Sequence, residues 1–129
     1  MNKILVEVSI GELLDKISIL EIKLDKIKDS ENLKFISNEH SILKKQLDNN
    51  VKSDDKLVKF FRSLKEINEK LWVIEDEKRQ CEKDKDFGKQ FIKLSRDVHF
   101  LNDERAKIKL DINNHTGSSI KEIKEYTSY

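Results

Sequence analysis

Several residue types that shape other proteins are scarce in this chain. It has no proline and only three glycines, Gly11, Gly88 and Gly117, so the strongest breakers of regular structure are nearly absent. Its single cysteine, Cys81, excludes an intrachain disulfide and any metal site built from clustered cysteines. The longest apolar run, Leu71 to Ile74, is far shorter than the roughly 20 residues of a membrane-spanning helix. These absences permit long helices and predict no metal, no cofactor and no membrane partner.

A secretory leader and a surface of one charge are also missing. Glu7 interrupts the apolar run that ends at Val6, so no signal-peptide core forms and we expect a cytoplasmic protein. Lys and Arg (26) nearly balance Asp and Glu (25), and the two signs are interspersed along the chain. This pattern gives no basic surface for nucleic acid.

What the chain does have is charge, with 40% charged and only 36% hydrophobic residues. Globular proteins average about 25% charged and about 45 to 50% apolar residues. The few apolar residues of this chain must therefore form narrow stripes on long, charged helices. At 129 residues the chain has the size of one domain, which can bury roughly two thirds of its unfolded surface. We therefore predict a single helical domain over residues 1–129.

The spacing of the apolar residues predicts four helices. Apolar residues recur alternately three and four positions apart, which is typical of an amphipathic helix. Residues 3–8 are rich in β-branched side chains and predict a short extended segment before the first helix. The predicted helices span residues 10–28, 31–48, 54–81 and 86–113.

Polar residues at the ends of these segments support the boundaries. Ser9 and Glu12 form a capping box for the first helix, Asp29 or Ser30 can cap the second, and Ser53 or Asp54 the third. The fourth helix can take Asp84 or Asp86 as its cap, and Gly117 supplies a left-handed stop. Ser119 and Glu122 form a second capping box, so residues 119–126 are either a short helix or a frayed tail.

These features predict an all-α fold, an elongated antiparallel helical bundle with a long two-helix hairpin. The apolar repeat of 3.5 residues is that of a coiled coil. The two hairpin helices would be about 40 Å long, more than the diameter of a compact globule of this size. Several apolar residues lie outside the main stripes and give some helices a second apolar face, which predicts a homodimer; they are Ile19, Ile22, Phe61, Trp72, Ile92 and Phe100.

A polar cluster is the strongest candidate site. Arg105 occupies a position of the apolar stripe, where a charge must be paired or lie beside water. Two polar stripes meet if the third and fourth helices pair; they contain Asn68, Trp72, Glu75 and Arg79 on one helix and Asn102, Arg105 and Lys109 on the other. The cluster is either a structural network, with Glu75 or Glu21 pairing Arg105, or a site for a small anionic ligand.

Other catalytic patterns are weaker. His99 and Asp103 lie one helical turn apart but lack further metal ligands. The pair Glu66-x-x-Glu69 is similar to the acidic motif of helical nucleotide pyrophosphohydrolases, but the second acidic pair of those enzymes is missing.

The helical chorismate mutases provide a resemblance in size and architecture. They hold a dicarboxylate with Arg and Lys side chains, and the resemblance implies an enzyme that binds an anionic metabolite. Their first helix supplies an essential arginine, whereas the first helix here carries only lysines, Lys16, Lys23 and Lys26. The likeness is therefore one of fold, which transfers little function.

Four motifs resemble a family of small uncharacterised bacterial and phage proteins. They are the strings at residues 6–23, 71–76 (Leu-Trp-Val-Ile-Glu-Asp), 86–88 (Asp-Phe-Gly) and 102–109 (Asn-Asp-Glu-Arg-Ala-Lys-Ile-Lys). The resemblance spans nearly the whole chain, implies a shared helical fold and transfers no catalytic residue.

Two functions follow from the sequence. The first is a self-associating module for protein–protein interaction, which presents an elongated surface to another protein. The alternative is a small enzyme or binding protein that holds an anionic metabolite with Arg79, Arg105 and Lys109. A filled stripe around Arg105 favours the first, and a pocket with unpaired cationic groups favours the second.

Overall fold

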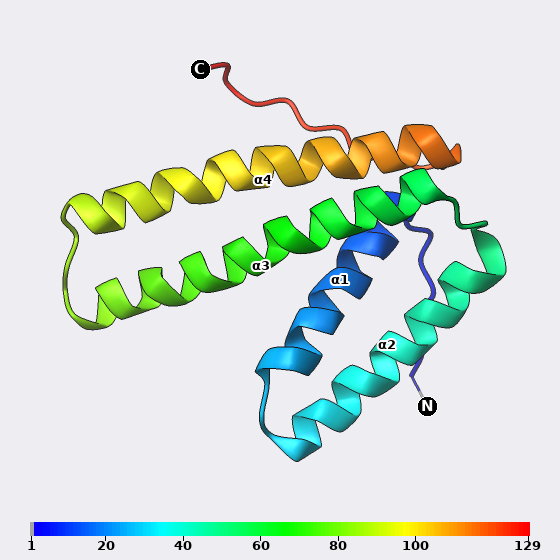
Figure 1. The fold of residues 1–129 in the computed structure, drawn as a ribbon, viewed down its shortest axis with the longest axis horizontal. Coiled ribbons are helices and arrows are strands. Elements are labelled where there is room, and N and C mark those ends of the chain that lie inside the picture. The colour runs from blue at the N-terminus through cyan, green and yellow to red at the C-terminus, as the bar shows by residue number, and fades with distance from the viewer. Residues whose placement is uncertain (1) are drawn as a thin grey trace.

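The computed structural model describes residues 2–129 as four helices without strands. In chain order they are α1 (Ile10–Lys26), α2 (Ser30–Asn50), α3 (Asp55–Lys83) and α4 (Lys89–Thr116). The prediction of an all-α fold is confirmed, and each helix overlaps the range expected from the sequence. Figure 1 shows two consecutive helix pairs, with the α1–α2 pair lying obliquely across one end of the longer α3–α4 pair.

Side-chain caps explain where the first three helices begin. In each case the capping oxygen accepts a hydrogen bond from a backbone amide of the first turn, which would otherwise have no helical partner. The caps are Ser9 Oγ (3.0 Å to the amide of Glu12), Asp29 Oδ2 (2.9 Å to that of Asn32) and Asp54 Oδ1 (2.7 Å to that of Leu57).

The fourth helix begins later than expected and has no such cap. Its N-cap is Gly88, which has no side chain to accept a hydrogen bond. Asp86 accepts from the amide of Gly88 at 3.1 Å and stabilises the preceding turn, while Asp84 closes α3 as its C-cap. The prediction that Asp84 or Asp86 caps α4 is wrong, because both residues belong to the connection that precedes it.

Helix α4 ends where the sequence predicts, at Gly117. Of the two alternatives for residues 119–126, a short helix or a frayed tail, the short helix is not formed. Gly117 is the C-cap in the left-handed conformation (φ 68°), as its place in the sequence indicates. Residues 119–129 form no helix. The predicted capping box fails because Glu122 reaches Lys109 on α4 rather than the backbone of Ser119.

The core lies where three helices meet at one end of the long hairpin. Helix α1 contacts α2, α3 and α4, whereas α2 contacts only α1 among the helices and contains no buried residue. The far half of the α3–α4 hairpin extends beyond this junction, and Figure 1 shows no other helix beside it. The central cluster of buried side chains consists of Leu14, Leu57, Leu64 and Ile112.

A close crossing between α1 and α4 fixes the position of α1. A Cβ atom added to Gly11 would lie 2.5 Å from the carbonyl oxygen of Lys109, so only glycine fits there. The Gly11 amide donates to Asn113 Oδ1 at 2.7 Å, and the Ile10 amide donates to Ser118 Oγ at 3.2 Å. The first amides of α1 are therefore bonded within the protein and do not form an open anion site.

Within residues 2–129, no helix combines the length and apolar character that a bilayer crossing requires.

Candidate functional site

An open groove with a volume of about 730 Å³ lies between α3 and α4. All its lining residues come from these two helices, so it lies on the part of the hairpin that α1 does not cover. We call it the groove; it is lined by Glu66, Glu69, Lys70, Val73, Ile74, Asp97, Phe100, Leu101 and Glu104.

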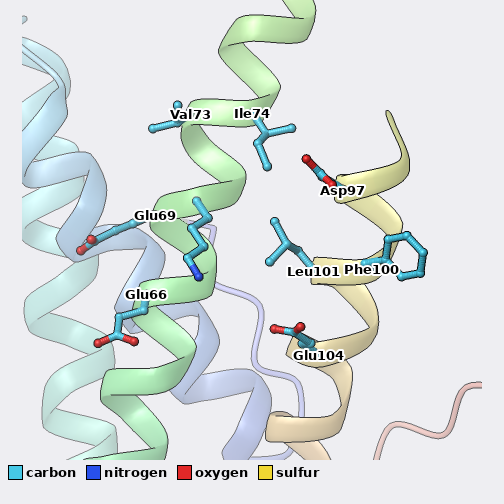
Figure 2. Close-up of a pocket in the computed structure, with 9 residues that line it drawn as sticks. Glu66, Glu69, Val73, Ile74, Asp97, Phe100, Leu101 and Glu104 are labelled. Atoms are coloured by element: carbon cyan, nitrogen blue, oxygen red, sulfur yellow. The ribbon is translucent and has the colours of Figure 1, made fainter. Parts of the chain in front are cut away.

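The groove has an apolar floor and an acidic side on α4, while Glu66 and Glu69 lie on the side of α3 away from α4 (Figure 2). Figure 2 shows Ile74 and Leu101 pointing into the space between the helices, with Asp97 and Glu104 reaching toward α3 from α4. Val73 and Phe100 remain 48% and 38% exposed, which is high for large apolar side chains. Four carboxylates against one ammonium give the lining a negative charge.

A second hollow of about 390 Å³ continues the groove toward the far end of the hairpin and shares Asp97 and Phe100 with it. Its other lining residues are Ile92, which is 55% exposed, and three cationic residues of α4. We call these three the basic strip; they are Lys89, Lys93 and Arg96. The guanidinium carbon of Arg96 lies 5.9 Å from the centre of the Phe100 ring. Along α4, the lining of the two hollows is therefore acidic toward the core and basic toward the far end, and Lys93 Nζ pairs with Asp97 Oδ2 at 2.7 Å between them.

The predicted polar cluster is brought together only in part. Five of its seven residues line one pocket of about 350 Å³, which we call the charged pocket. Apolar residues of α1, which the sequence placed on a second apolar face, form its other wall. Its lining residues are Ile19, Ile22, Asn68, Leu71, Trp72, Glu75, Asp76, Arg79 and Arg105.

Arg105 has an amide partner where an acid was expected. Its Nη1 donates to Asn68 Oδ1 at 3.2 Å, and it forms no ion pair within 4.0 Å among the described residues. Glu21, one expected partner, instead pairs with Lys65 at 3.1 Å and with His40 at 3.3 Å. The prediction that Glu75 or Glu21 pairs with Arg105 is wrong, because the adjacent amide and not a carboxylate occupies the position next to the guanidinium.

Asn68 is held by a buried network that the sequence did not reveal. Its Nδ2 donates to Asp15 Oδ1 at 2.9 Å and to Ser18 Oγ at 2.8 Å, and Ser18 Oγ donates to the carbonyl of Asp15 at 2.8 Å. All three residues are buried. With both its donor hydrogens engaged, the amide must present Oδ1 to Arg105. Asp15 and Ser18, two polar residues spaced three apart on the buried face of α1, were the only trace of this network in the sequence.

The two other residues of the predicted cluster lie elsewhere. Asn102 is half-buried on α4 and lines neither the groove nor the charged pocket. Lys109 is 8% exposed, and its Nζ donates to Glu12 Oε2 at 2.6 Å and to Glu122 Oε2 at 2.9 Å. Its ammonium therefore links α4 to the start of α1 and to the C-terminal tail. Because it is already paired with the carboxylates of Glu12 and Glu122, it is not a free cationic group for a ligand.

Burial and the surrounding carboxylates shift the pKa of Lys109 in opposite directions. Burial favours the neutral amine and lowers the pKa, but the hydrogen bonds to Glu12 and Glu122 and the charges of Glu12 and Asp15 outweigh burial. The pKa of Lys109 is therefore raised and the ammonium stays charged. The hydrogen bond from Lys109 in turn lowers the pKa of Glu122.

Cys81 is buried near the far end of α3. Burial raises the pKa of its thiol, and the negative charges of Asp86, Asp84 and Glu77 raise it further. A raised pKa leaves little thiolate at neutral pH, which indicates a packing residue and not an activated thiol. Among residues 2–129, no group of three or more His, Cys, Asp or Glu side chains is arranged to hold a metal ion.

The fold defines an all-α protein of two packed helix pairs, with a groove on one side of the long hairpin and a charged pocket at the junction. A family model described as a family of unknown function, DUF6165, matches residues 4–129, so the chain belongs to this family. The comparison with curated proteins gave no match, and neither did the comparison with solved structures. Membership of a family without an assigned function, spanning nearly the whole chain, is what the sequence motifs predicted.

Proposed function

We propose that this protein is a self-associating helical interaction module. In this proposal, two copies pair through the face of the α3–α4 hairpin that carries the groove and the basic strip, which we call the pairing face. The observation that carries the proposal is the charge distribution on this face, which is acidic at one end and basic at the other. The pocket beside Arg105, with its cationic groups outside any ion pair among the described residues, supports the alternative of a ligand site; self-association is proposed for a different surface, the pairing face.

The charge distribution makes the face complementary to itself. Homodimers are most often related by a twofold axis, in which the same patch of both copies is used and residue i of one copy meets residue j of the other. A twofold axis near Asp97, which both hollows share, would place Lys89 and Lys93, the outer part of the basic strip, opposite the acidic end of the other copy, with Lys89 facing Glu104. Opposite charges set in this way give specificity and speed association.

The helical rise supports this position of the axis. On α4, Lys89 lies eight residues before Asp97 and Glu104 lies seven residues after it, which correspond to about 12 Å and about 10 Å along the helix. The two ends of the face are therefore nearly equidistant from Asp97. Antiparallel pairing brings them together, whereas parallel pairing would oppose like charges.

Exposed apolar side chains provide the attraction at the centre of the face. Val73, Ile92 and Phe100 are each more than a third exposed, although large apolar residues are normally buried. Phe100 and Val73 lie close to the proposed axis. In a symmetric dimer both copies of each side chain would therefore be covered by the partner. A contiguous apolar patch surrounded by charges is typical of a protein–protein interface.

A charge-reversal cycle tests the proposal by sedimentation equilibrium. The parent protein should have twice its chain mass of 15.3 kDa. Glu69→Lys with Glu104→Lys makes both ends basic, and Lys89→Glu with Lys93→Glu makes both ends acidic, so each double variant should be monomeric. A mixture of the two double variants should form a 1:1 dimer, and the quadruple variant should dimerise with itself.

A matched control changes charge away from the pairing face. Lys16→Glu with Lys28→Glu reverses two exposed lysines on and after α1 and should leave the dimer intact. A parent protein that sediments at 15.3 kDa at micromolar concentrations would refute self-association. A parent dimer that survives both double variants would show that another face is used.

A further inference from the structure

We infer that the charged pocket binds a small zwitterion with an apolar side chain, of the chemical class of a free α-amino acid. This inference does not rest on the proposed self-association, because the pocket contains α1 residues and shares no lining residue with the groove. It depends on the juxtaposition of unpaired charges of both signs with an apolar wall.

The guanidinium of Arg105 has unused hydrogen-bonding capacity. A guanidinium has five N–H donors in a planar fork that fits a carboxylate with two parallel hydrogen bonds. Among residues 2–129, only Nη1 has a protein partner, Asn68 Oδ1 at 3.2 Å. Because Asp15 and Ser18 fix Asn68, the guanidinium is positioned at the pocket before any ligand arrives. Pre-positioned donors reduce the entropic cost of binding.

The balance of charge in the pocket selects a ligand with both signs. Arg79 and Arg105 contribute two positive charges, and Glu75 and Asp76 contribute two negative charges. None of the four forms an ion pair within 4.0 Å among the described residues, although Glu75 and Arg79 are spaced one helical turn apart. A simple anion would gain from the arginines and lose to the carboxylates. A molecule with a carboxylate and an ammonium satisfies both pairs.

The remaining wall determines the side chain of the ligand. Ile19 and Ile22 of α1 and Leu71 and Trp72 of α3 give the pocket its apolar lining. The volume of about 350 Å³ lies at the lower end of the range for ligand sites, about 300 to 1,000 Å³. An amino acid with a branched aliphatic or aromatic side chain fits both the size and the apolar wall.

The pocket also contains a reporter of its own occupancy. Trp72 is the only tryptophan of the chain, so intrinsic tryptophan fluorescence comes from the pocket alone. We would titrate the protein with L-phenylalanine, exciting where phenylalanine and tyrosine do not absorb. The same titration with N-acetyl-L-phenylalanine removes the ammonium, and L-phenylalanine amide removes the carboxylate.

We expect saturable binding of L-phenylalanine, and at least about tenfold weaker binding of both derivatives, because each loses one charge-assisted contact. Arg105→Lys should weaken binding by a similar factor, since an ammonium cannot form the two-pronged contact. The control is Arg62→Lys, which changes an exposed arginine of α3 that does not line the pocket.

Each arm of the experiment has a result that overturns the inference. No saturable change in Trp72 fluorescence with L-phenylalanine or L-leucine removes the site. Equal binding of the free and N-acetylated forms shows a simple anion site, as does tighter binding of succinate. Circular dichroism shows whether Arg105→Lys keeps the fold. Glu75→Gln provides a second variant, which should weaken binding of the free amino acid but not binding of its N-acetyl form.

Discussion

Replacement of Gly11 by alanine tests the packing of α1 against α4 at a single atom. The added Cβ would lie 2.5 Å from the carbonyl oxygen of Lys109 and 3.0 Å from Asn113 Oδ1. Ordinary contact begins near 3.4 Å, so α1 and α4 must separate by about 0.9 Å at this point. The obstacle is backbone of the facing helix, which cannot turn aside as a flexible side chain can.

The expected loss of stability combines three effects. Overpacking of this kind costs about 1 to 3 kcal/mol. Separation of the helices also weakens the buried hydrogen bond from the Gly11 amide to Asn113 Oδ1, at a cost of about 1 to 3 kcal/mol. Alanine recovers up to about 1 kcal/mol through its higher helix propensity. The sum predicts that Gly11→Ala lowers the free energy of unfolding by about 3 kcal/mol.

Urea denaturation followed by circular dichroism measures this change. With a denaturant dependence of about 1 to 3 kcal/mol per molar, the midpoint should fall by about 1 to 3 M. Gly88→Ala is the matched control, because its Cβ would meet only the movable carboxylate of Asp86 at 3.3 Å, and we expect a change within about 1 kcal/mol. An unchanged or higher midpoint for Gly11→Ala would refute the close crossing of α1 and α4.

Three further variants test other contacts. Asn68→Leu should lower the free energy of unfolding by about 3 kcal/mol, because it leaves the buried Asp15 carboxylate without its hydrogen-bond donor. Adding Asp15→Leu should restore much of this loss. A double variant that recovers no stability would contradict the network. Glu122 has a lowered pKa when folded, so its contribution is present above its ordinary value of 4.5 and lost as pH falls through the folded pKa. Glu122→Gln should therefore be less stable than the parent at neutral pH and equal to it in strong acid, as urea midpoints would show. Cys81 should react with a disulfide reagent only as fast as the chain unfolds, and rapid reaction of the native protein would show an activated thiol.

The sequence predicts local structure well where a residue acts on its own neighbours. Ser9, Asp29 and Asp54 cap helices as expected, since a cap depends only on residues within one turn. Gly117 ends α4 for a similarly local reason, its tolerance of a positive φ. The late start of α4 at Lys89 was missed because the alternating charges of the turn offered several equivalent caps.

Contacts between distant residues were harder to predict. The apolar spacing of α2 equals that of the other helices, yet α2 buries no residue, because periodicity identifies a face but not the partner that covers it. The same limit applies to the candidate site. The polar stripe of α3 and Arg105 do meet, but Lys109 is drawn to the start of α1 by Glu12, a contact between residues almost a hundred positions apart.

Disulfide trapping tests the proposed pairing face most directly, because a residue beside a twofold axis lies close to its own copy. Asp97→Cys in a Cys81→Ala background would place the only thiol of each chain near the proposed axis. Lys16→Cys in the same background is the control, since Lys16 is exposed on α1 and lies off the face. Under mild oxidation we predict that the Asp97→Cys chain runs at twice 15.3 kDa on a non-reducing gel while the control stays monomeric. An Asp97→Cys chain that stays at 15.3 kDa, or crosslinks no faster than the control, would contradict pairing through this face.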